Sequence, residues 1–532
     1  MQEQRRDWMA KQREKLGLSQ AEMGERFPVP EARISLWERG TTGVRLNNQR
    51  AIAKNYELPL DAVLARFRSE KQGGLTGNSD VELDPPTDPT TLAVSPMEGT
   101  MAPRASSVPP SRELKNTDFL PWVERHSALS FREAYDRVLA LVHELESEPS
   151  AVRLGKSHAR GRVSRTDISQ ALRAFYGEDD RFYRARVAGE LLQVGLLVTG
   201  REQVDVNIPF NMAADHVSLV AAGTQDTVGT VDGVALESAL RRLAEVELAR
   251  TVLVDRPLYR LQDFEFRKNN WRAVLSESDF LSFALTNDLL EGELVGALAE
   301  GKPVSSSSLP LRSRYLPTVD SALDFEHRCC VGGVAGLLAV ARKDPDDYLL
   351  LVQRRSSKVL NLAGRLSVIP RAFHQPINEV GREIYFTKTL QREMEEELLG
   401  REDLDLLDDD RRVDPLHPAR STAAMRALQE PGVCRMECTG FGINATNGNY
   451  ELSALIVVDD PAWWDSFGHL VEANWESSGL QRYSSLDTLG LTSLIRDPKW
   501  SSGGLFELLQ GLRRLAELEP EKVAAPAIEV MP

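Results

Sequence analysis

Three glutamates late in the chain are spaced so that one helix face would carry all of them. Glu393, Glu396 and Glu397 stand at positions i, i+3 and i+4, which are neighbours on an α-helix. Packed carboxylates repel each other, and a divalent cation relieves that repulsion, with hard oxygen ligands suiting Mg²⁺ or Mn²⁺. A diphosphate could bind to this metal ion, whose positive charge would stabilise the transition state of hydrolysis. Acidic helix faces that only contact water show the same spacing, so that alternative stays open.

The residues around these glutamates have the pattern of an α/β domain that would position them. Apolar runs on both sides of the turn Asp344–Asp347 predict two neighbouring strands. The expected elements are strands at 331–341, 348–355, 366–370 and 450–458, with a helix at about 385–399. That helix would direct Leu390, Met394 and Leu398 into a core and leave the glutamates on another face.

The helix segment Arg392–Glu397 resembles the box of the Nudix superfamily, which ends in Arg-Glu, an apolar residue, any residue and Glu-Glu. The resemblance covers about residues 327–515. It implies that Glu396 and Glu397 ligate a metal, that Glu393 is a catalytic base or a further ligand, and that Arg392 orients a glutamate.

The chain departs from the Nudix pattern before the box. The family has a glycine and a glutamate where this chain has Asn378 and Ile384, and a glycine pair where it has Ala372 and Phe373. The resemblance therefore implies a Nudix-like domain with a degenerate box. It would sense, or slowly hydrolyse, a nucleotide diphosphate derivative such as ADP-ribose.

The first forty residues carry a second pattern, in which two short helices are joined by a break. Ser19 and Glu22 have the spacing of a capping box, which begins a helix. The segment Phe27–Pro30 ends that helix, since proline lacks an amide donor. Ile34 and Trp37 then recur on one face of a second helix.

These residues resemble the Cro/C1-type (XRE) helix-turn-helix family, through Leu18-Ser19-Gln20 and the segment Ile34–Gly40. The resemblance covers about residues 5–67. It implies that the second helix lies in the major groove of double-stranded DNA and that a homodimer reads paired half-sites. The residues expected at DNA are Gln20, Glu31, Ala32, Arg33, Ser35, Leu36 and Arg39. Gln20 and Arg39 would hold phosphates. The alternative is a helical protein-interaction module without a DNA role.

Length and composition indicate a multidomain protein of the cytoplasm. The 532 residues exceed what one core accommodates, and the net charge of −15 argues against general binding to polyanions. No apolar run approaches the ~20 residues of a membrane helix, so no membrane partner is expected. The four cysteines lack zinc-site spacing and are expected to be core thiols.

The predicted organisation has five parts. They are an all-α helix-turn-helix domain (1–68), a disordered linker rich in proline, glycine and serine (69–117), a mainly helical middle domain (118–320), the α/β Nudix-like domain (321–518) and a flexible tail (519–532). Within the middle domain, helical segments are expected at 130–146, 164–199, 234–253 and 277–299. A winged-helix element near 164–210 is an alternative there, and no motif assigns a function to this region.

Together these patterns predict a bacterial-type transcriptional regulator with a nucleotide-sensing Nudix-like domain. A competing hypothesis is a metal-dependent Nudix pyrophosphohydrolase that the helix-turn-helix only localises. A third is an interaction protein in which neither site is active. Turnover of nucleotide diphosphates with magnesium would separate the enzyme from the regulator.

Overall fold

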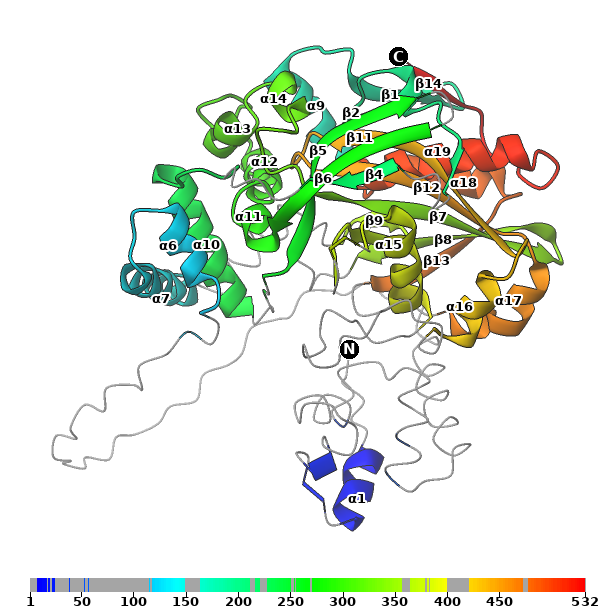
Figure 1. The fold of residues 1–532 in the computed structure, drawn as a ribbon, viewed down its shortest axis with the longest axis horizontal. Helices are drawn as coiled ribbons and strands as arrows, with labels where there is room; N and C mark the ends of the chain where they lie inside the picture. Colours follow the sequence, from blue (N-terminus) through cyan, green and yellow to red (C-terminus); the bar gives the residue numbers. More distant parts are fainter. Residues whose placement is uncertain are drawn as a thin grey trace, which may run out of the picture. The chain divides into compact units, whose positions relative to one another are not determined.

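The chain divides into two units, Met1–Arg112 and Glu113–Pro532, in a computed structural model (Figure 1). The residues that the structure describes are 7–16, 18, 19, 22, 23, 38, 52, 56, 114, 117–148, 163–210, 216–220, 227–249, 253, 255–267, 270–355, 364–377, 380, 381, 383–399, 421–471 and 477–531. The predicted linker at 69–117 lies outside them, except for residues 114 and 117.

The N-terminal unit begins with helix α1 (Asp7–Lys15). Four apolar side chains from well-separated positions are fully buried in this unit, namely Met9, Met23, Ile52 and Tyr56. The predicted capping box is confirmed, because Glu22 N–H donates to Ser19 Oγ at 3.2 Å and Ser19 N–H donates to Glu22 Oε2 at 2.7 Å. A helix therefore starts where the sequence predicted one.

The second unit is a mixed α/β structure built on a large sheet. Its strands are β1 (Phe182–Val187), β2 (Glu190–Leu197), β3 (Ile208–Pro209), β7 (Gly332–Lys343), β8 (Asp346–Arg355), β9 (Leu366–Val368), β10 (Arg371–Phe373), β11 (Cys434–Asn444), β12 (Tyr450–Val458), β13 (Ser477–Ser484) and β14 (Ile528–Met531). Their main path runs β13-β8-β7-β12-β11-β2-β1-β14. β7 and β12 are parallel, whereas β7 and β8 are antiparallel. The predicted strands β7, β8, β9 and β12 are confirmed.

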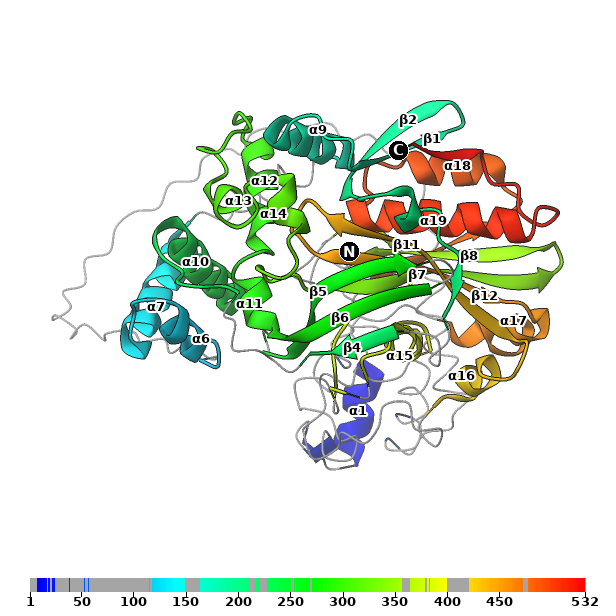
Figure 2. The same cartoon turned by 45° about the horizontal axis from the view of Figure 1, so that its top comes forward.

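Helices cover both faces of this sheet (Figure 2). One face carries α18 (Thr488–Arg496) and α19 (Ser502–Leu518), and the other carries α15 (Phe386–Glu393), α16 (Ala423–Leu428) and α17 (Pro461–Phe467). Successive side chains of a strand point to opposite faces. Accordingly, Leu337 packs into the α19 core and Leu338 into the α15 core.

The central strands β7 and β8 separate towards one end of the sheet, and a short segment fills the opening. β9 pairs with the end of β8 through Val352↔Val368, whereas β10 pairs with the start of β7 through Arg371↔Ala335. Residues 369 and 370 form the corner between β9 and β10, with Pro370 O accepting from Gly336 N at 2.9 Å. Arg371 therefore lies between two strands and within reach of both faces.

A smaller sheet and a set of helices flank the large sheet. The smaller sheet has the order β4-β6-β5. Its strands are β4 (His216–Leu219), β5 (Pro257–Arg267) and β6 (Asn270–Asp279). The helices are α6 (Leu120–His126), α7 (Phe131–Ser147), α9 (Arg165–Tyr176), α10 (Gly233–Ala249), α11 (Phe280–Ala284), α12 (Leu289–Ala299), α13 (Pro310–Tyr315) and α14 (Val319–Leu323). Short 3₁₀ turns cover Arg201–Gln203 and Gly468–Leu470. No described helix combines the length and apolarity of a membrane span.

Part of the middle region differs from the prediction. The segment 164–199 was expected to be helical, but only α9 is a helix, and the rest forms the hairpin β1–β2. The turn has positive φ at Ala188 (47°) and Gly189 (85°), as a two-residue hairpin turn requires. Likewise, 277–299 contains the end of β6 before α11 and α12. The described middle region thus contains six strands beside its eight helices.

The predicted boundary at 320 and the predicted flexible tail are also wrong. β1 and β2 belong to the same sheet as β7–β14, and residues 113–532 form one unit. In the tail, Ile528–Met531 is strand β14, which pairs antiparallel with β1. The reason is backbone pairing between distant segments, which satisfies amide groups that a free tail would leave to water.

A fully buried arginine joins the helices to the sheet. Arg312 of α13 donates from Nη1 to Ala445 O at 2.6 Å and to Tyr176 Oη at 3.0 Å. Its Nη2 donates to Thr446 O at 2.5 Å and to Leu290 O at 3.4 Å. The guanidinium therefore holds the turn between β11 and β12 in place through hydrogen bonds. This turn is buried.

Candidate functional site

A buried ion pair holds together the part of the N-terminal unit that is expected to read DNA. Arg13 Nε lies 2.6 Å from Glu38 Oε1, and Arg13 Nη2 lies 3.1 Å from Glu38 Oε2. The side chains are only 11% and 5% exposed. Arg13 Nη1 also donates to Leu18 O at 2.8 Å, just before the capping box. The hydrogen bonds that Arg13 donates to Glu38 raise the pKa of Arg13, so the guanidinium stays charged.

The same unit is tied together by Tyr56. Gln12 Nε2 of α1 donates to Tyr56 O at 2.9 Å, and Tyr56 Oη lies 3.5 Å from Glu38 Oε1. Burial raises the pKa of Tyr56, which keeps the phenol neutral. The residues predicted to contact DNA, namely Gln20, Glu31, Ala32, Arg33, Ser35, Leu36 and Arg39, lie outside the described residues. Their contacts stay predictions.

The acidic helix of the second unit does not continue as a regular α-helix. α15 ends at Glu393, and Met394–Leu398 form a π turn, closed by Leu399 N–H donating to Met394 O at 3.2 Å. The predicted α-helix to residue 399 is therefore wrong in its last turn. A π turn has a wider repeat than an α-helix, so the predicted i, i+3, i+4 face is altered. Such turns frequently occur at functional sites.

Donors of the protein itself contact the predicted metal ligands. Glu397 Oε2 accepts from Arg371 N at 2.8 Å, and Glu397 Oε1 lies 3.3 Å from Gln353 Nε2 and 3.8 Å from Arg355 Nη1. Glu393 Oε1 accepts from Arg392 Nη2 at 3.2 Å. Arg392 therefore contacts its immediate neighbour Glu393, and its role in orienting a glutamate stays a prediction.

The carboxylates, as placed, do not form a ligand set. Glu396 and Glu397 are buried, with 6% and 1% exposure. In the described part of the chain, no three histidine, cysteine or acidic side chains are grouped so that they could hold a metal ion. Binding of Mg²⁺ or Mn²⁺ by Glu393, Glu396 and Glu397 therefore stays a prediction, and the present geometry does not fit it.

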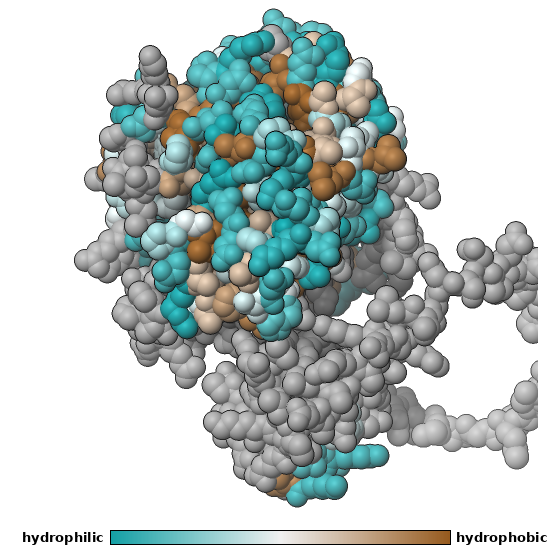
Figure 3. Space-filling model, turned by 90° about the vertical axis from the view of Figure 1, so that its right-hand side faces the viewer, coloured by the Kyte–Doolittle hydropathy of each residue, from teal (hydrophilic) through white to brown (hydrophobic). Residues whose placement is uncertain are grey.

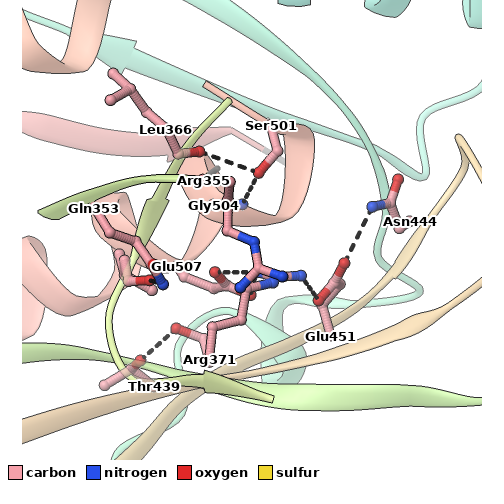
Figure 4. Close-up of polar contacts among 12 residues, drawn as sticks. Gln353, Arg355, Leu366, Arg371, Thr439, Asn444, Glu451, Ser501, Gly504 and Glu507 are labelled. Carbon is pink, nitrogen blue, oxygen red and sulfur yellow. Dashed lines mark hydrogen bonds and ion pairs between the residues drawn. The ribbon is translucent and has the colours of Figure 1, made fainter. Parts of the chain in front are cut away.

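A charged cluster that the sequence did not predict surrounds the side chain of Arg371 (Figure 4), the residue whose main-chain N–H donates to Glu397 of the π turn. The guanidinium of Arg371 donates from Nη1 to both oxygens of Glu507 at 2.7 Å and from Nη2 to Glu451 Oε2 at 2.6 Å. Asn444 Nδ2 donates to Glu451 Oε1 at 3.0 Å. A Cβ at Gly503 would lie 2.7 Å from Glu451 Oε1, so a larger residue here would displace this carboxylate. We name Arg371, Asn444, Glu451 and Glu507 the Arg371 cluster.

The Arg371 cluster makes the unfolding free energy depend on pH. Burial raises the pKa of Glu507 to about 8, and the negative charge of Glu451 adds to the effect, while Arg371 opposes it. The folded state thus binds a proton that the unfolded state releases near its ordinary pKa of 4.5. This contribution to stability is complete below that value and is lost as the pH rises to about 8.

We expect the unfolding free energy of the second unit to fall between about pH 5 and pH 8. In the Glu507→Gln variant that slope should be much smaller, because glutamine does not titrate. Urea unfolding at a series of pH values measures both slopes. As a control, Glu529→Gln changes an exposed glutamate, 67% accessible, and should leave the slope unchanged. Equal slopes in wild type and Glu507→Gln would contradict this assignment.

Sequence reasoning missed both Arg13–Glu38 and the Arg371 cluster. Arg371 is separated from Glu451 by 80 residues and from Glu507 by 136, so no local spacing reveals them. A weak signal was present in β12, where Glu451 is the one charged residue of a mainly apolar strand. A carboxylate in a buried strand requires a partner.

On the face of the second unit that Figure 3 shows, hydrophilic residues lie between several hydrophobic groups. Among the described residues, the large apolar side chains that are exposed are Phe131, Leu191, Val220, Val234, Leu486 and Leu489. Apart from Leu486 and Leu489, which are three residues apart near the start of α18, they come from separate segments of the chain, as scattered surface residues commonly do.

Comparison with protein families confirms part of the sequence interpretation. The helix-turn-helix family model matches residues 9–63, which agrees with the predicted Cro/C1-type module. No curated protein matches the chain. The match suggests a DNA-binding regulator, and it covers most of α1, the capping box and the Arg13–Glu38 pair.

Proposed function

We propose that this protein is a transcriptional regulator of the cytoplasm that binds specific double-stranded DNA as a homodimer. The family match at residues 9–63 carries the proposal. It is supported by the ion pair between Arg13 and Glu38, which connects α1 to the position directly before Arg39. A helix can present side chains to base edges only if such contacts fix its orientation.

The second unit is proposed to sense a nucleotide diphosphate derivative through a Nudix-like region. The observation that supports this role is the order of elements, in which β7, β8, β9 and α15 precede the acidic π turn. Frequent use of π turns at functional sites adds to it. The second candidate function is hydrolysis of a pyrophosphate bond by the same region. It is favoured by the three glutamates of the Nudix-like box, Glu393, Glu396 and Glu397. Release of a nucleoside monophosphate from a nucleotide diphosphate with Mg²⁺ would favour the enzyme.

The DNA proposal is tested by selecting sequences from a random pool of duplexes with the full-length protein. Replacing both Arg33 and Ser35 by alanine should then weaken binding to the selected sequence by about 2–6 kcal/mol, since each good base contact contributes roughly 1–3 kcal/mol. Binding to random DNA should change less, because phosphate contacts carry it. A fluorescence-anisotropy titration at fixed salt measures both affinities.

A matched control removes an arginine that is far from the expected DNA surface in sequence. Arg132→Ala deletes an exposed guanidinium, 80% accessible, that pairs with Asp136 on α7. It should leave both affinities unchanged. If the selection enriches no sequence and the folded protein binds all duplexes equally, the proposed function is wrong.

A further inference from the structure

The Arg371 cluster lies next to a second buried pair of ionisable side chains, Arg355 and Glu397. The guanidinium of Arg371 faces the carboxyl groups of Glu451 and Glu507, and that of Arg355 faces Glu397. Their side chains are between 0% and 14% exposed. Charges buried to this degree persist in proteins only when they are paired and hydrogen-bonded.

Arg371 reaches these partners because of its place in the fold. Arg371 belongs to β10, which lies in the opening between β7 and β8. The main-chain N–H of Arg371 is therefore directed to one face of the sheet and its side chain to the other. The main-chain N–H donates to Glu397 of the π turn, and the guanidinium contacts Glu507 of α19 and Glu451 of β12. One residue thus links the helices that cover opposite faces.

A divalent ion bound to the Arg371 cluster would need the carboxyl oxygen atoms that already accept hydrogen bonds from Arg371 and Asn444. Metal ligation takes lone pairs of carboxylate oxygens. Here both oxygens of Glu507 accept from Arg371, and Glu451 accepts from Arg371 through one oxygen and from Asn444 through the other. Both oxygens of Glu397 likewise face nitrogen donors, on Arg371 and Gln353.

We propose that Arg371 is a built-in cation, which occupies the position between Glu451 and Glu507 that a divalent metal ion would otherwise require. The acidic centre of the second unit then binds neither Mg²⁺ nor Mn²⁺, and whatever ligand the unit recognises is bound without a metal bridge. The inference does not depend on DNA binding, because it concerns only contacts within the second unit.

The test compares thermal unfolding of full-length variants with and without Mn²⁺ or Mg²⁺. Wild type should show no metal-dependent change in Tm. Arg371→Ala removes the cation and leaves Glu451 and Glu507 facing each other, so its Tm should fall by several degrees. Mn²⁺ should then raise the Tm of Arg371→Ala in a saturable way, since a ligand that binds only the folded state stabilises it. Arg371→Lys keeps a positive charge and should show a smaller metal response.

The matched control is Arg435→Ala. Arg435 also lies between two carboxylates, of Asp459 and Glu519, but these three side chains are about one-third exposed. Its removal should give no recovery with Mn²⁺, because water already solvates the carboxylates.

Two outcomes would overturn the proposal. One is a metal-dependent rise in the Tm of wild type that disappears in the double variant Glu396→Gln and Glu397→Gln, which would establish a metal site on the π turn. The other is an Arg371→Ala protein that folds and does not respond to either metal. If Arg371→Ala does not fold, the wild-type titration still decides, since a built-in cation predicts that neither metal raises the Tm of wild type.

Discussion

Replacing Arg13 with methionine is expected to unfold much of the N-terminal unit and to abolish specific DNA binding. The change leaves Glu38, which is 5% exposed, without the guanidinium that neutralises it. Removal of one partner from a buried ion pair costs about 3–5 kcal/mol. That is a large fraction of the roughly 5–15 kcal/mol that stabilises a typical domain. Thermal unfolding and DNA titration of the full-length variant measure the two effects.

Two further variants isolate the cause. Changing Arg13 to methionine together with Glu38 to leucine removes both charges and should recover much of the lost stability, because an apolar pair of similar size needs no neutralisation. Lys11→Met alters an exposed residue of the same helix and should have little effect. If Arg13→Met is no less stable than Lys11→Met, the ion pair does not hold this unit together.

The second large effect is expected at Arg312 in the other unit. Arg312→Met deprives four acceptors of their donor, including Ala445 O and Thr446 O of the buried turn. Each buried acceptor left unsatisfied costs about 1–3 kcal/mol, so we expect a loss of at least 3 kcal/mol. Urea unfolding followed by tryptophan fluorescence measures it.

The control for Arg312 is Arg132→Met, which removes an exposed guanidinium from α7. Exposed ion pairs contribute about 0–1 kcal/mol, so this variant should unfold almost like wild type. A loss below 1 kcal/mol for Arg312→Met would show that water or a rearranged turn replaces its hydrogen bonds.

The sequence was informative wherever a feature depends on neighbouring residues. Ser19 and Glu22 are three positions apart, and their capping box was predicted and found. The apolar runs of β7 and β12 were recognised as strands because a strand buried on both faces has no polar alternation. The helical stripe from Ala134 to Leu145 likewise became α7.

Features that depend on distant residues were not predicted. Phe182–Val187 was assigned to a helix, although Tyr183, Ala185 and Val187 alternate with arginines at the period of a strand. Its strand character is fixed by pairing with β2 and with β14, which no local pattern contains. The Arg371 cluster was missed for the same reason, because its carboxylates come from β12 and α19.

The pairing of β1 with β14 has a consequence for the biosynthesis of the protein. Arg186 and Glu529, which face each other across these strands, are separated by 343 residues. At a synthesis rate of about 5–20 residues per second, roughly 20–70 s pass after β1 is made before its partner exists. During that time one edge of β1 is open to pairing with another nascent chain. Arg184 and Arg186 place two positive charges on that edge, and charged side chains are a common protection against aggregation.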